Sequence, residues 1–231
     1  MTGKVYGLGL GPGDPELVTV KVVRLINTAP VIAYPRTQHG DSFVREIAKP
    51  YVPTSAIELP LDTPMAIDTT VAQAKYDEHA ELIAAHLDAG RDVALLCEGD
   101  PFLFGSFMYL YDRLADRYEV EVVPGVSSIT ACAAAAGLPL CSREDILTVL
   151  PGTLSEEILE RELTQTSSAV IMKVGRHLPK IRRVIEKLGC TGGATYVERA
   201  LNPGQRVVPL ARLTDEVAPY FSVILVFRDT D

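Results

Sequence analysis

The 231 residues of the chain are enough for one large domain or two small ones with a sizeable hydrophobic core. Hydrophobic residues make up 47% and charged residues 23%, which is typical of a soluble globular protein. The formal net charge of -8 argues against a general nucleic-acid binder, which needs a basic face for phosphates. It does not exclude an anionic small molecule as ligand, which would need a local basic patch.

The sequence carries no signal for a membrane span, a leader or a metal site. No apolar run reaches the roughly 20 residues of a membrane helix, and no basic segment followed by an apolar one opens the chain. We therefore expect a cytoplasmic protein with no membrane partner. The four cysteines lack metal-ligand spacing, and the four histidines form no zinc pattern, so we expect no metal site.

Predicted strands and helices alternate along the chain, which indicates an α/β fold. In the first half, strands are expected at 4–10, 31–34, 57–59, 93–97 and 120–123, and helices at 15–27, 42–49, 68–90, 107–115 and 128–137. In the second half, strands are expected at 146–150, 169–174, 194–198, 207–210 and 221–227, and helices at 155–164 and 178–188. The late strands follow one another closely, which predicts antiparallel pairing there. We expect two α/β domains, residues 1–117 and 118–231, with a cleft between them.

The stretch from Leu96 to Gly105, LCEGDPFLFG, follows the apolar strand expected at 93–97. Ligands bind at the carboxyl ends of strands in open α/β sheets, and the helix expected after this stretch directs its positive end there. Glu98 or Asp100 could accept hydrogen bonds from hydroxyls or amines, while Gly99 lets a ligand approach the backbone. An ordinary strand-to-helix turn is the alternative, because Gly, Asp and Pro are common turn residues.

Two further glycine-containing segments follow predicted strands. GLGPGDPEL resembles a dinucleotide fingerprint only loosely, because its first three glycines fall on alternate residues and no acidic residue follows at the expected distance. The missing lysine-hydroxyl pair argues against a phosphate-binding P-loop. In VPGVSSITACAAAAGLPL, Gly125 turns the chain and Ser127 or Ser128 caps a helix of small residues. Close approach of a ligand and tight helix-to-sheet packing explain the alanines equally well.

Together, GLGPGDPELVT, EGDPFLFGS and VPGVSSITACAAAAGLPL resemble, in order and spacing, three motifs of the tetrapyrrole (corrin and porphyrin) methyltransferase family. The segments IMKVGRH and YVERAL lie where that family has its later cofactor-contacting strands. YPRT and CEGDPFLFGSFMYLYDRL are most similar to the members that methylate C20 of precorrin-2, giving precorrin-3A in vitamin B12 synthesis. The members that act on the cobalt-bearing analogue are scarcely separable by sequence.

The resemblance implies that S-adenosylmethionine binds between the two domains, leaves as S-adenosylhomocysteine, and that the chain forms a homodimer. Carried over by position, the residues that bind this cofactor would be Pro12, Glu98, Gly99, Asp100, Leu103, Ser127, Ser128, Val174 and Ala200. In the family, the position of Pro12 is near the substrate end, and the positions of Glu98, Gly99, Asp100 and Leu103 surround the amino-acid part and ribose. The positions of Ser127 and Ser128 contact the methionine carboxylate, and those of Val174 and Ala200 contact adenine.

One departure from the family pattern bears on activity. Relatives that act on uroporphyrinogen III carry an aspartate, assigned as proton acceptor, where this chain has Pro35. Its absence argues against that activity and leaves the catalytic residue unknown. Glu98 or Asp100 could act as a base, although cofactor binding is the favoured role for both.

A tetrapyrrole substrate carries several carboxylates, so cations at the ends of predicted strands are candidates to hold it. These cations are Arg36, His39, Lys173, Arg176, His177 and Arg199. Each of them singly is more readily explained as a solvated surface charge. Two other functions are less favoured: methylation of RNA, because the chain is acidic, and a non-catalytic module that holds a nucleotide or a tetrapyrrole.

Overall fold

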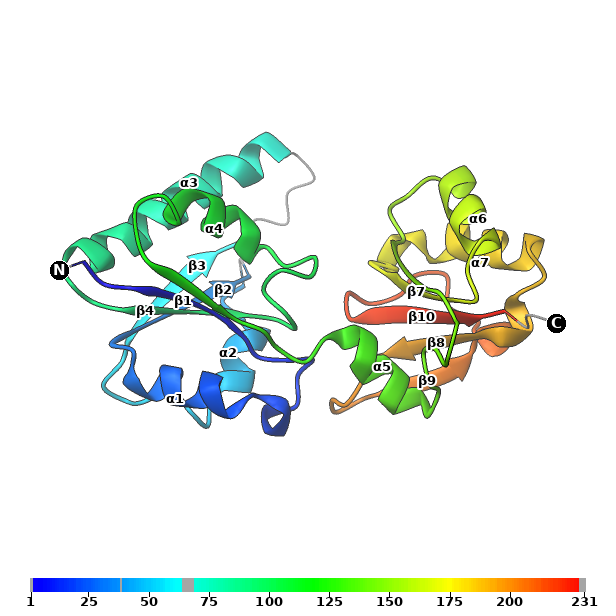
Figure 1. Ribbon diagram of the computed structural model, residues 1–231, viewed down its shortest axis with the longest axis horizontal. Helices are drawn as coiled ribbons and strands as arrows, with labels where there is room; N and C mark the ends of the chain where they lie inside the picture. The colour runs from blue at the N-terminus through cyan, green and yellow to red at the C-terminus, as the bar shows by residue number, and fades with distance from the viewer. Residues whose placement is uncertain (1, 38, 64–68, 229–231) are drawn as a thin grey trace. The chain divides into compact units, whose positions relative to one another are not determined.

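The computed structural model describes residues 2–37, 39–63 and 69–228 (Figure 1). The chain divides into two compact units, Met1–Ser127 and Ser128–Asp231, each built around one five-stranded sheet. The predicted α/β fold class is confirmed. The units divide after Ser127 rather than after residue 117, because the strand at 120–123 belongs to the first sheet.

The first sheet is parallel throughout. Its strands are β1 (Val5–Gly9), β2 (Val31–Arg36), β3 (Ile57–Asp62), β4 (Val93–Cys97) and β5 (Val120–Val123), in the order β3-β2-β4-β1-β5. All five residues of the central strand β4 are buried, as expected for a parallel strand covered on both faces. Its side chains alternate, with Val93, Leu95 and Cys97 on one face and Ala94 and Leu96 on the other.

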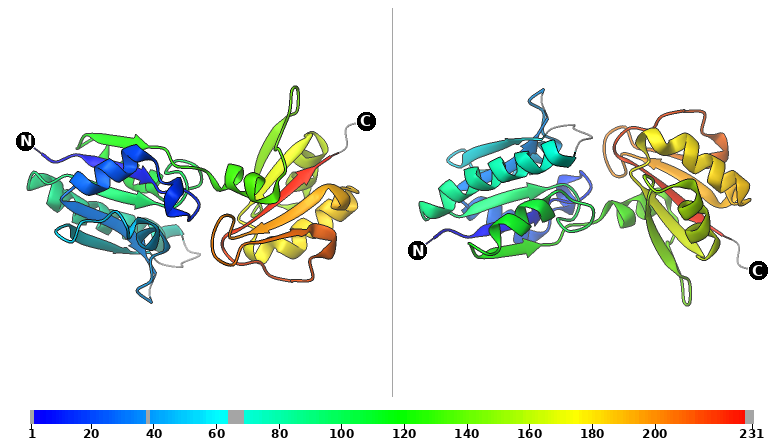
Figure 2. Two further views of the ribbon diagram at one scale, coloured as in Figure 1. Left: turned by 90° about the horizontal axis from the view of Figure 1, so that it is seen from below. Right: turned by 90° about the horizontal axis from the view of Figure 1, so that it is seen from above.

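Helices cover both faces of this sheet, as Figure 2 shows from opposite sides. The face that carries Leu95 packs against α3 (Thr69–Asp88) and α4 (Phe107–Leu114). The face that carries Leu96 packs against α1 (Val20–Thr28) and α2 (Phe43–Ala48). The first residue of the helix expected at 68–90, Asp68, lies outside the described residues.

Several predicted elements of the first unit differ from the structure, among them the strand expected at 57–59, which continues to Asp62 as β3. The helix expected at 15–27 is divided into a short 3-10 helix, η1 (Pro15–Leu17), and α1, because Val18 and Thr19 are extended and the Thr19 hydroxyl caps α1. Strand β2 continues through Pro35 to Arg36. Proline is tolerated there because β2 pairs with β4 only from Val31 to Ala33, and beyond that only with β3.

The second sheet is mixed. Its strands are β6 (Leu147–Pro151), β7 (Ser168–Met172), β8 (Ala194–Glu198), β9 (Arg206–Pro209) and β10 (Ser222–Phe227), in the order β6-β7-β10-β8-β9. Strands β6 and β7 are parallel, and the other three pairs are antiparallel. The antiparallel pairing predicted for the late strands is confirmed.

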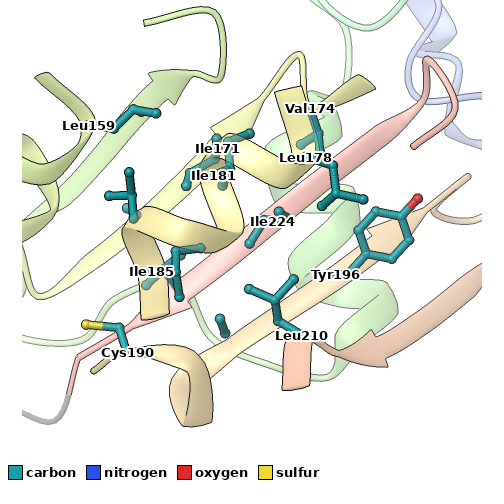
Figure 3. Close-up of a cluster of buried hydrophobic side chains, with 14 of the residues drawn as sticks. Leu159, Ile171, Val174, Leu178, Ile181, Ile185, Cys190, Tyr196, Leu210 and Ile224 are labelled. Carbon is teal, nitrogen blue, oxygen red and sulfur yellow. The ribbon is translucent and has the colours of Figure 1, made fainter. Parts of the chain in front are cut away.

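The helices of the second unit bury one compact core, drawn in Figure 3. Helices α6 (Glu156–Thr164) and α7 (Leu178–Lys187) pack over the face that carries Ile171, Tyr196 and Ile224. Helix α5 (Ser128–Ala136) packs against β8 and β10. Three short 3-10 helices complete the unit: η2 (Gly175–His177), η3 (Thr191–Gly193) and η4 (Leu210–Arg212).

Candidate functional site

The first two glycine-containing segments meet at the carboxyl end of the first sheet. Strands β1 and β4 are neighbours, and their pairing continues past the strand ends. The Leu10 amide donates to the Cys97 carbonyl at 2.9 Å. Gly11 and Gly99 then exchange two backbone hydrogen bonds, of 3.2 and 2.9 Å. The structure therefore joins the GLGPGDPEL and EGDPFLFGS segments directly.

The third segment, which follows β5, packs onto the other two through glycine backbones. A Cβ atom on Gly9 would lie 2.5 Å from the Gly125 nitrogen, and one on Gly125 would lie 2.1 Å from the Gly99 carbonyl oxygen. Both distances are shorter than real Cβ contacts, so only glycine fits at these two positions. Gly99 has a φ of +62°, and the space where its Cβ would stand is open. Backbone at Gly99 is therefore accessible to a ligand.

Asp100 holds the loop in place. Its Oδ1 accepts the Phe102 amide at 2.9 Å, and its Oδ2 accepts the Gly125 amide at 3.2 Å. One carboxylate thus closes the turn after β4 and fixes it to the segment after β5. Both contacts are within the chain, so part of the hydrogen-bonding capacity of Asp100 is used to build the site.

Glu98 differs from Asp100 because its carboxylate has no partner in the described part of the chain. The side chain is partly buried, and this loss of hydration raises the pKa of Glu98. No described residue donates a hydrogen bond to it or forms an ion pair with it. A carboxylate in this state is ready to accept hydrogen bonds from a ligand or to attract its positive charge.

Six of the nine predicted cofactor-binding residues lie on these three segments within the first unit. They are Pro12, Glu98, Gly99, Asp100, Leu103 and Ser127. The other three, Ser128, Val174 and Ala200, lie in the second unit, where Ser128 continues the third segment. The part of all nine in binding stays a prediction. Ser128 is the first residue of α5.

The two positions predicted to contact adenine follow strands of the second sheet. Val174 comes after β7, and its side chain is fully buried in the core of that unit (Figure 3). Its backbone is therefore the part that a ligand could contact. Ala200 comes after β8, is 7% exposed, and its carbonyl accepts the Asn202 side-chain amide at 2.8 Å.

The cations predicted to bind substrate carboxylates fall into two groups. Arg36 is already paired with Asp62, through its Nε at 2.8 Å and an NH2 nitrogen at 2.7 Å. His39 is exposed in the loop after β2. The others lie at the carboxyl ends of β7 and β8: Lys173, Arg176 and Arg199 are exposed, and His177 is partly buried. Burial, together with the nearby charges of Lys180 and Arg176, lowers the pKa of His177, which indicates a positive local potential.

Two aromatic residues of this site are not singled out by the sequence reasoning. Phe102 and Phe104 follow Asp100, and they are 49% and 40% exposed. Phe104 has a φ of +55°, which is unfavourable for a bulky residue. The Phe102 ring stands edge-on to Tyr111, with 5.2 Å between ring centroids. The signal in the sequence is the presence of two phenylalanines directly after the Gly, Asp and Pro of a turn.

Comparison with known proteins gives the family. The model of the Tetrapyrrole (Corrin/Porphyrin) Methylases matches residues 4–214. The chain belongs to the tetrapyrrole methylase family. The resemblance seen in the three motifs is therefore confirmed.

Full-length relatives in this family include two with closely related names. The chain is 46% identical to the precorrin-2 C(20)-methyltransferase of Sinorhizobium sp, over 97% of the chain and 95% of the relative. It is 32% identical to the cobalt-precorrin-2 C(20)-methyltransferase of Salmonella typhimurium, over 98% and 97% of the two chains. It spans about half, 46%, of the cobalamin biosynthesis protein CobIJ of Mycobacterium tuberculosis, at 44% identity.

A solved structure of a family member carries the demethylated cofactor. It is the uroporphyrin-III C-methyltransferase of Thermus thermophilus complexed with S-adenosylhomocysteine, with a TM-score of 0.70 and 27% identity over 97% and 92% of the two chains. The site described here fits that cofactor class. S-adenosylmethionine carries a sulfonium, an ammonium and ribose hydroxyls, and the first unit offers an unpartnered carboxylate beside accessible glycine backbone.

The described residues contain no helix suited to crossing a membrane and no cluster of metal ligands. None of their helices combines the length and the apolar character needed to cross a membrane. No three of their His, Cys, Asp and Glu side chains gather as metal ligands.

Proposed function

We propose that the chain is an S-adenosylmethionine-dependent C-methyltransferase that methylates precorrin-2 at C20, giving precorrin-3A in cobalamin biosynthesis. The observation that carries this proposal is that all three family motifs meet around Glu98 at one sheet edge, in a chain 46% identical to a relative of that name. The metal-free substrate is favoured over the cobalt-bearing one because the relative named for cobalt-precorrin-2 is only 32% identical.

The residues of the first unit bind and position the methyl donor in this account. When bound, S-adenosylmethionine supplies a methyl group on a positively charged sulfur. The Glu98 carboxylate attracts positive charge, the Gly99 backbone permits close contact, and Asp100 keeps the loop in one conformation. Alignment of reacting groups in well-oriented systems contributes about 7 to 11 kcal/mol, so no nucleophilic side chain is required.

The proton that leaves the methylated carbon needs an acceptor, and β2 offers no carboxylate at the position that carries one in uroporphyrinogen III relatives. Pro35 stands there, paired with Leu61 of β3, and its carbonyl accepts the Ser42 hydroxyl at 2.6 Å. In our proposal, water or a weak base takes the proton. We also propose, from the family, a cytoplasmic homodimer that binds no nucleic acid.

Mass spectrometry of the reaction product tests the proposed function. Purified protein is incubated with S-adenosylmethionine and precorrin-2, and in parallel with the cobalt-bearing analogue. We expect the tetrapyrrole to gain one methyl group and S-adenosylhomocysteine to accumulate with the metal-free substrate. Transfer only to the cobalt-bearing analogue would reassign the substrate, and transfer to neither would refute the proposed activity.

A binding measurement separates this enzyme from the alternative of a non-catalytic tetrapyrrole carrier. Isothermal titration with S-adenosylhomocysteine should show saturable binding to the full chain. A protein that binds the tetrapyrrole but neither form of the cofactor would be a carrier or sensor instead.

A further inference from the structure

Strands β7 and β8 deliver their carboxyl ends to the same edge of the second sheet. Both are antiparallel to β10, which lies between them (Figure 1), so they run in the same direction. Ile224 of β10 pairs with Ile171 of β7 on one side and with Tyr196 of β8 on the other. Lys173 and Arg199, which follow these strands, are therefore offset by only one residue along the sheet.

Each of the two strands ends in the same way. Lys173 has a φ of +56° and Arg199 a φ of +48°, a left-handed conformation that is unfavourable for residues with a Cβ. Both cations are exposed, whereas the residues that follow them, Val174 and Ala200, are buried. The left-handed turn thus leaves a cation in solvent while the next residue packs inward. Glycine or asparagine would make this turn more easily, so the turn alone does not explain a cation at both positions.

Backbone hydrogen bonds fix both turns. The Arg199 amide donates to the Phe221 carbonyl at 2.9 Å, and the Gly175 carbonyl accepts the Ala218 amide at 3.1 Å. The cations therefore project from rigid backbone rather than from a loose loop, as groups that hold a ligand in one orientation should.

Two of the cations at this edge form no ion pair within the described part of the chain. They are Arg199 from the β8 turn and Arg176 from η2. Four other cations of the second unit do form ion pairs: Arg161, Arg183, Lys187 and Arg206. In a chain with a net charge of -8, such a group of cations is a local positive patch, and its complement is an anion.

We propose that Lys173, Arg176 and Arg199 form a clamp for the carboxylate arms of the tetrapyrrole substrate. This assignment rests on the proposed function. Two inter-strand spacings separate the backbones of Lys173 and Arg199, about 10 Å in all. This spacing allows the two cations to bind different carboxylates of one macrocycle at the same time. Arginine adds orientation, because its planar fork binds a carboxylate through two hydrogen bonds.

Equilibrium binding of sirohydrochlorin, a tetrapyrrole polycarboxylate, to the full chain tests the clamp without requiring methyl transfer. The charge-removing variants are Lys173→Asn and Arg199→Asn, because asparagine tolerates the left-handed conformation, together with Arg176→Gln. The matched control is Arg212→Gln. Arg212 is an exposed cation in η4, which follows Pro209, the partner of Thr195 at the opposite end of β8.

Each clamp variant should raise the dissociation constant for sirohydrochlorin about three- to tenfold, as expected for partly exposed ion pairs. The double variant Lys173→Asn/Arg199→Asn should weaken binding further and reduce its salt dependence. Arg199→Lys should restore part of the affinity. The dissociation constant for S-adenosylhomocysteine should stay unchanged and the thermal midpoint should not fall, because asparagine makes the left-handed turn more easily. This result separates a substrate contact from a structural role.

Two results would overturn the clamp: the three variants bind sirohydrochlorin as tightly as Arg212→Gln, or their affinity for S-adenosylhomocysteine falls by the same factor. The wild-type methyl-transfer assay reports separately on the proposed function. If the wild type transfers no methyl group but the variants lose tetrapyrrole affinity, the clamp is supported and the proposed reaction is refuted. If methyl transfer occurs and the variants have an unchanged KM for precorrin-2, the proposed reaction is supported and the clamp is refuted.

Discussion

The two sheets end in chemically different edges. The carboxyl edge of the first, parallel sheet carries close-packed glycine backbone and the carboxylate of Glu98, which has no partner among the described residues. The carboxyl edge of β7 and β8 in the second, mixed sheet presents cations on rigid left-handed turns. The first suits a ligand with positive charge and hydroxyls, and the second suits a ligand with several negative charges. A methyl donor and a polycarboxylate acceptor have these two sets of properties.

The two units also differ in how many of their cations form ion pairs. Most cations of the first unit are tied up in ion pairs along its strands and helices, as in the Arg45–Glu58 pair at 2.7 Å. Arg176 and Arg199 of the second unit form no such pair in the described part of the chain. Removing a paired cation such as Arg45 should therefore affect stability, whereas removing Arg176 or Arg199 should affect ligand binding.

The largest effect is expected from adding a methyl group where the three glycine segments meet. In Gly125→Ala the new Cβ would lie 2.1 Å from the Gly99 carbonyl oxygen, and backbone must move to relieve the clash. We expect a loss of about 1 to 3 kcal/mol in the free energy of unfolding, as for overpacked cores. Calorimetric affinity for S-adenosylhomocysteine should fall by more than about tenfold, since 1.4 kcal/mol of lost binding energy corresponds to that factor.

The matched control for that variant is Gly192→Ala, since no atom lies within 4 Å of a Cβ placed there. It should leave both measurements unchanged. Equal losses in the two variants would show that the close approach at Gly125 has no special part in the site.

The second largest effect is expected at Glu98, the carboxylate at the carboxyl edge of the first sheet. Glu98→Gln keeps the shape of the side chain and removes its charge, so the affinity for S-adenosylmethionine should fall about tenfold or more, the usual range for a charged hydrogen bond. Titration calorimetry measures it. Glu81→Gln, which removes an exposed partner of Arg117, is the control and should bind normally. Normal binding by Glu98→Gln would remove Glu98 from the site.

The same variant should be slightly more stable than the wild type without ligand. Because burial raises the pKa of Glu98 above 4.5, the folded chain holds its proton more tightly than the unfolded chain. Ionisation therefore costs stability at neutral pH, and this cost disappears as the pH falls through the raised pKa. Urea unfolding should show a gain of roughly 1 kcal/mol for Glu98→Gln at pH 7, and the gain should vanish below pH 4. A loss of stability at pH 7 would mean that the carboxylate has a partner.

The smallest effect is expected from an ion pair of the first unit. Hydrogen bonds from Arg45, and a further one from Tyr34, lower the pKa of Glu58 to about 2. The stabilisation is present above the ordinary pKa of 4.5 and is lost as the pH falls towards 2. Because the Glu58 side chain is 39% exposed, Glu58→Gln should cost less than about 1 kcal/mol at pH 7. Denaturant curves should show a lower free energy of unfolding for Glu58→Gln than for the wild type at pH 7 and no such difference at pH 2. A difference that persists at pH 2 would point to lost packing instead.

The elements that sequence predicts best are those whose apolar pattern is continuous. Strand β4 has the predicted bounds, because VALLC is a continuous apolar run of the length of a strand. The division of the helix expected at 15–27 was missed, because it depends on the Thr19 cap competing with a continuous helix pattern. The boundary between the units was placed too early, because the pairing of β5 with β1 is a long-range contact.

The candidate site, like the fold, depends on long-range contacts that the sequence does not show. The motifs predicted which segments matter, and the sheet order then joined Gly11 to Gly99 as expected for neighbouring strand ends. Sequence could not assign different tasks to Glu98 and Asp100, because only the fold shows that Asp100 accepts the Gly125 amide while Glu98 has no such partner. The left-handed conformations of Lys173 and Arg199 were also beyond prediction, since neither residue type favours them.

A crystal structure of the chain grown with S-adenosylhomocysteine tests the central claim most directly. Our account predicts that the ligand lies against the loop from Glu98 to Leu103, in contact with the Gly99 backbone and within hydrogen-bonding distance of the Glu98 carboxylate. A ligand bound elsewhere, with that loop facing solvent and Glu98 untouched, would contradict it.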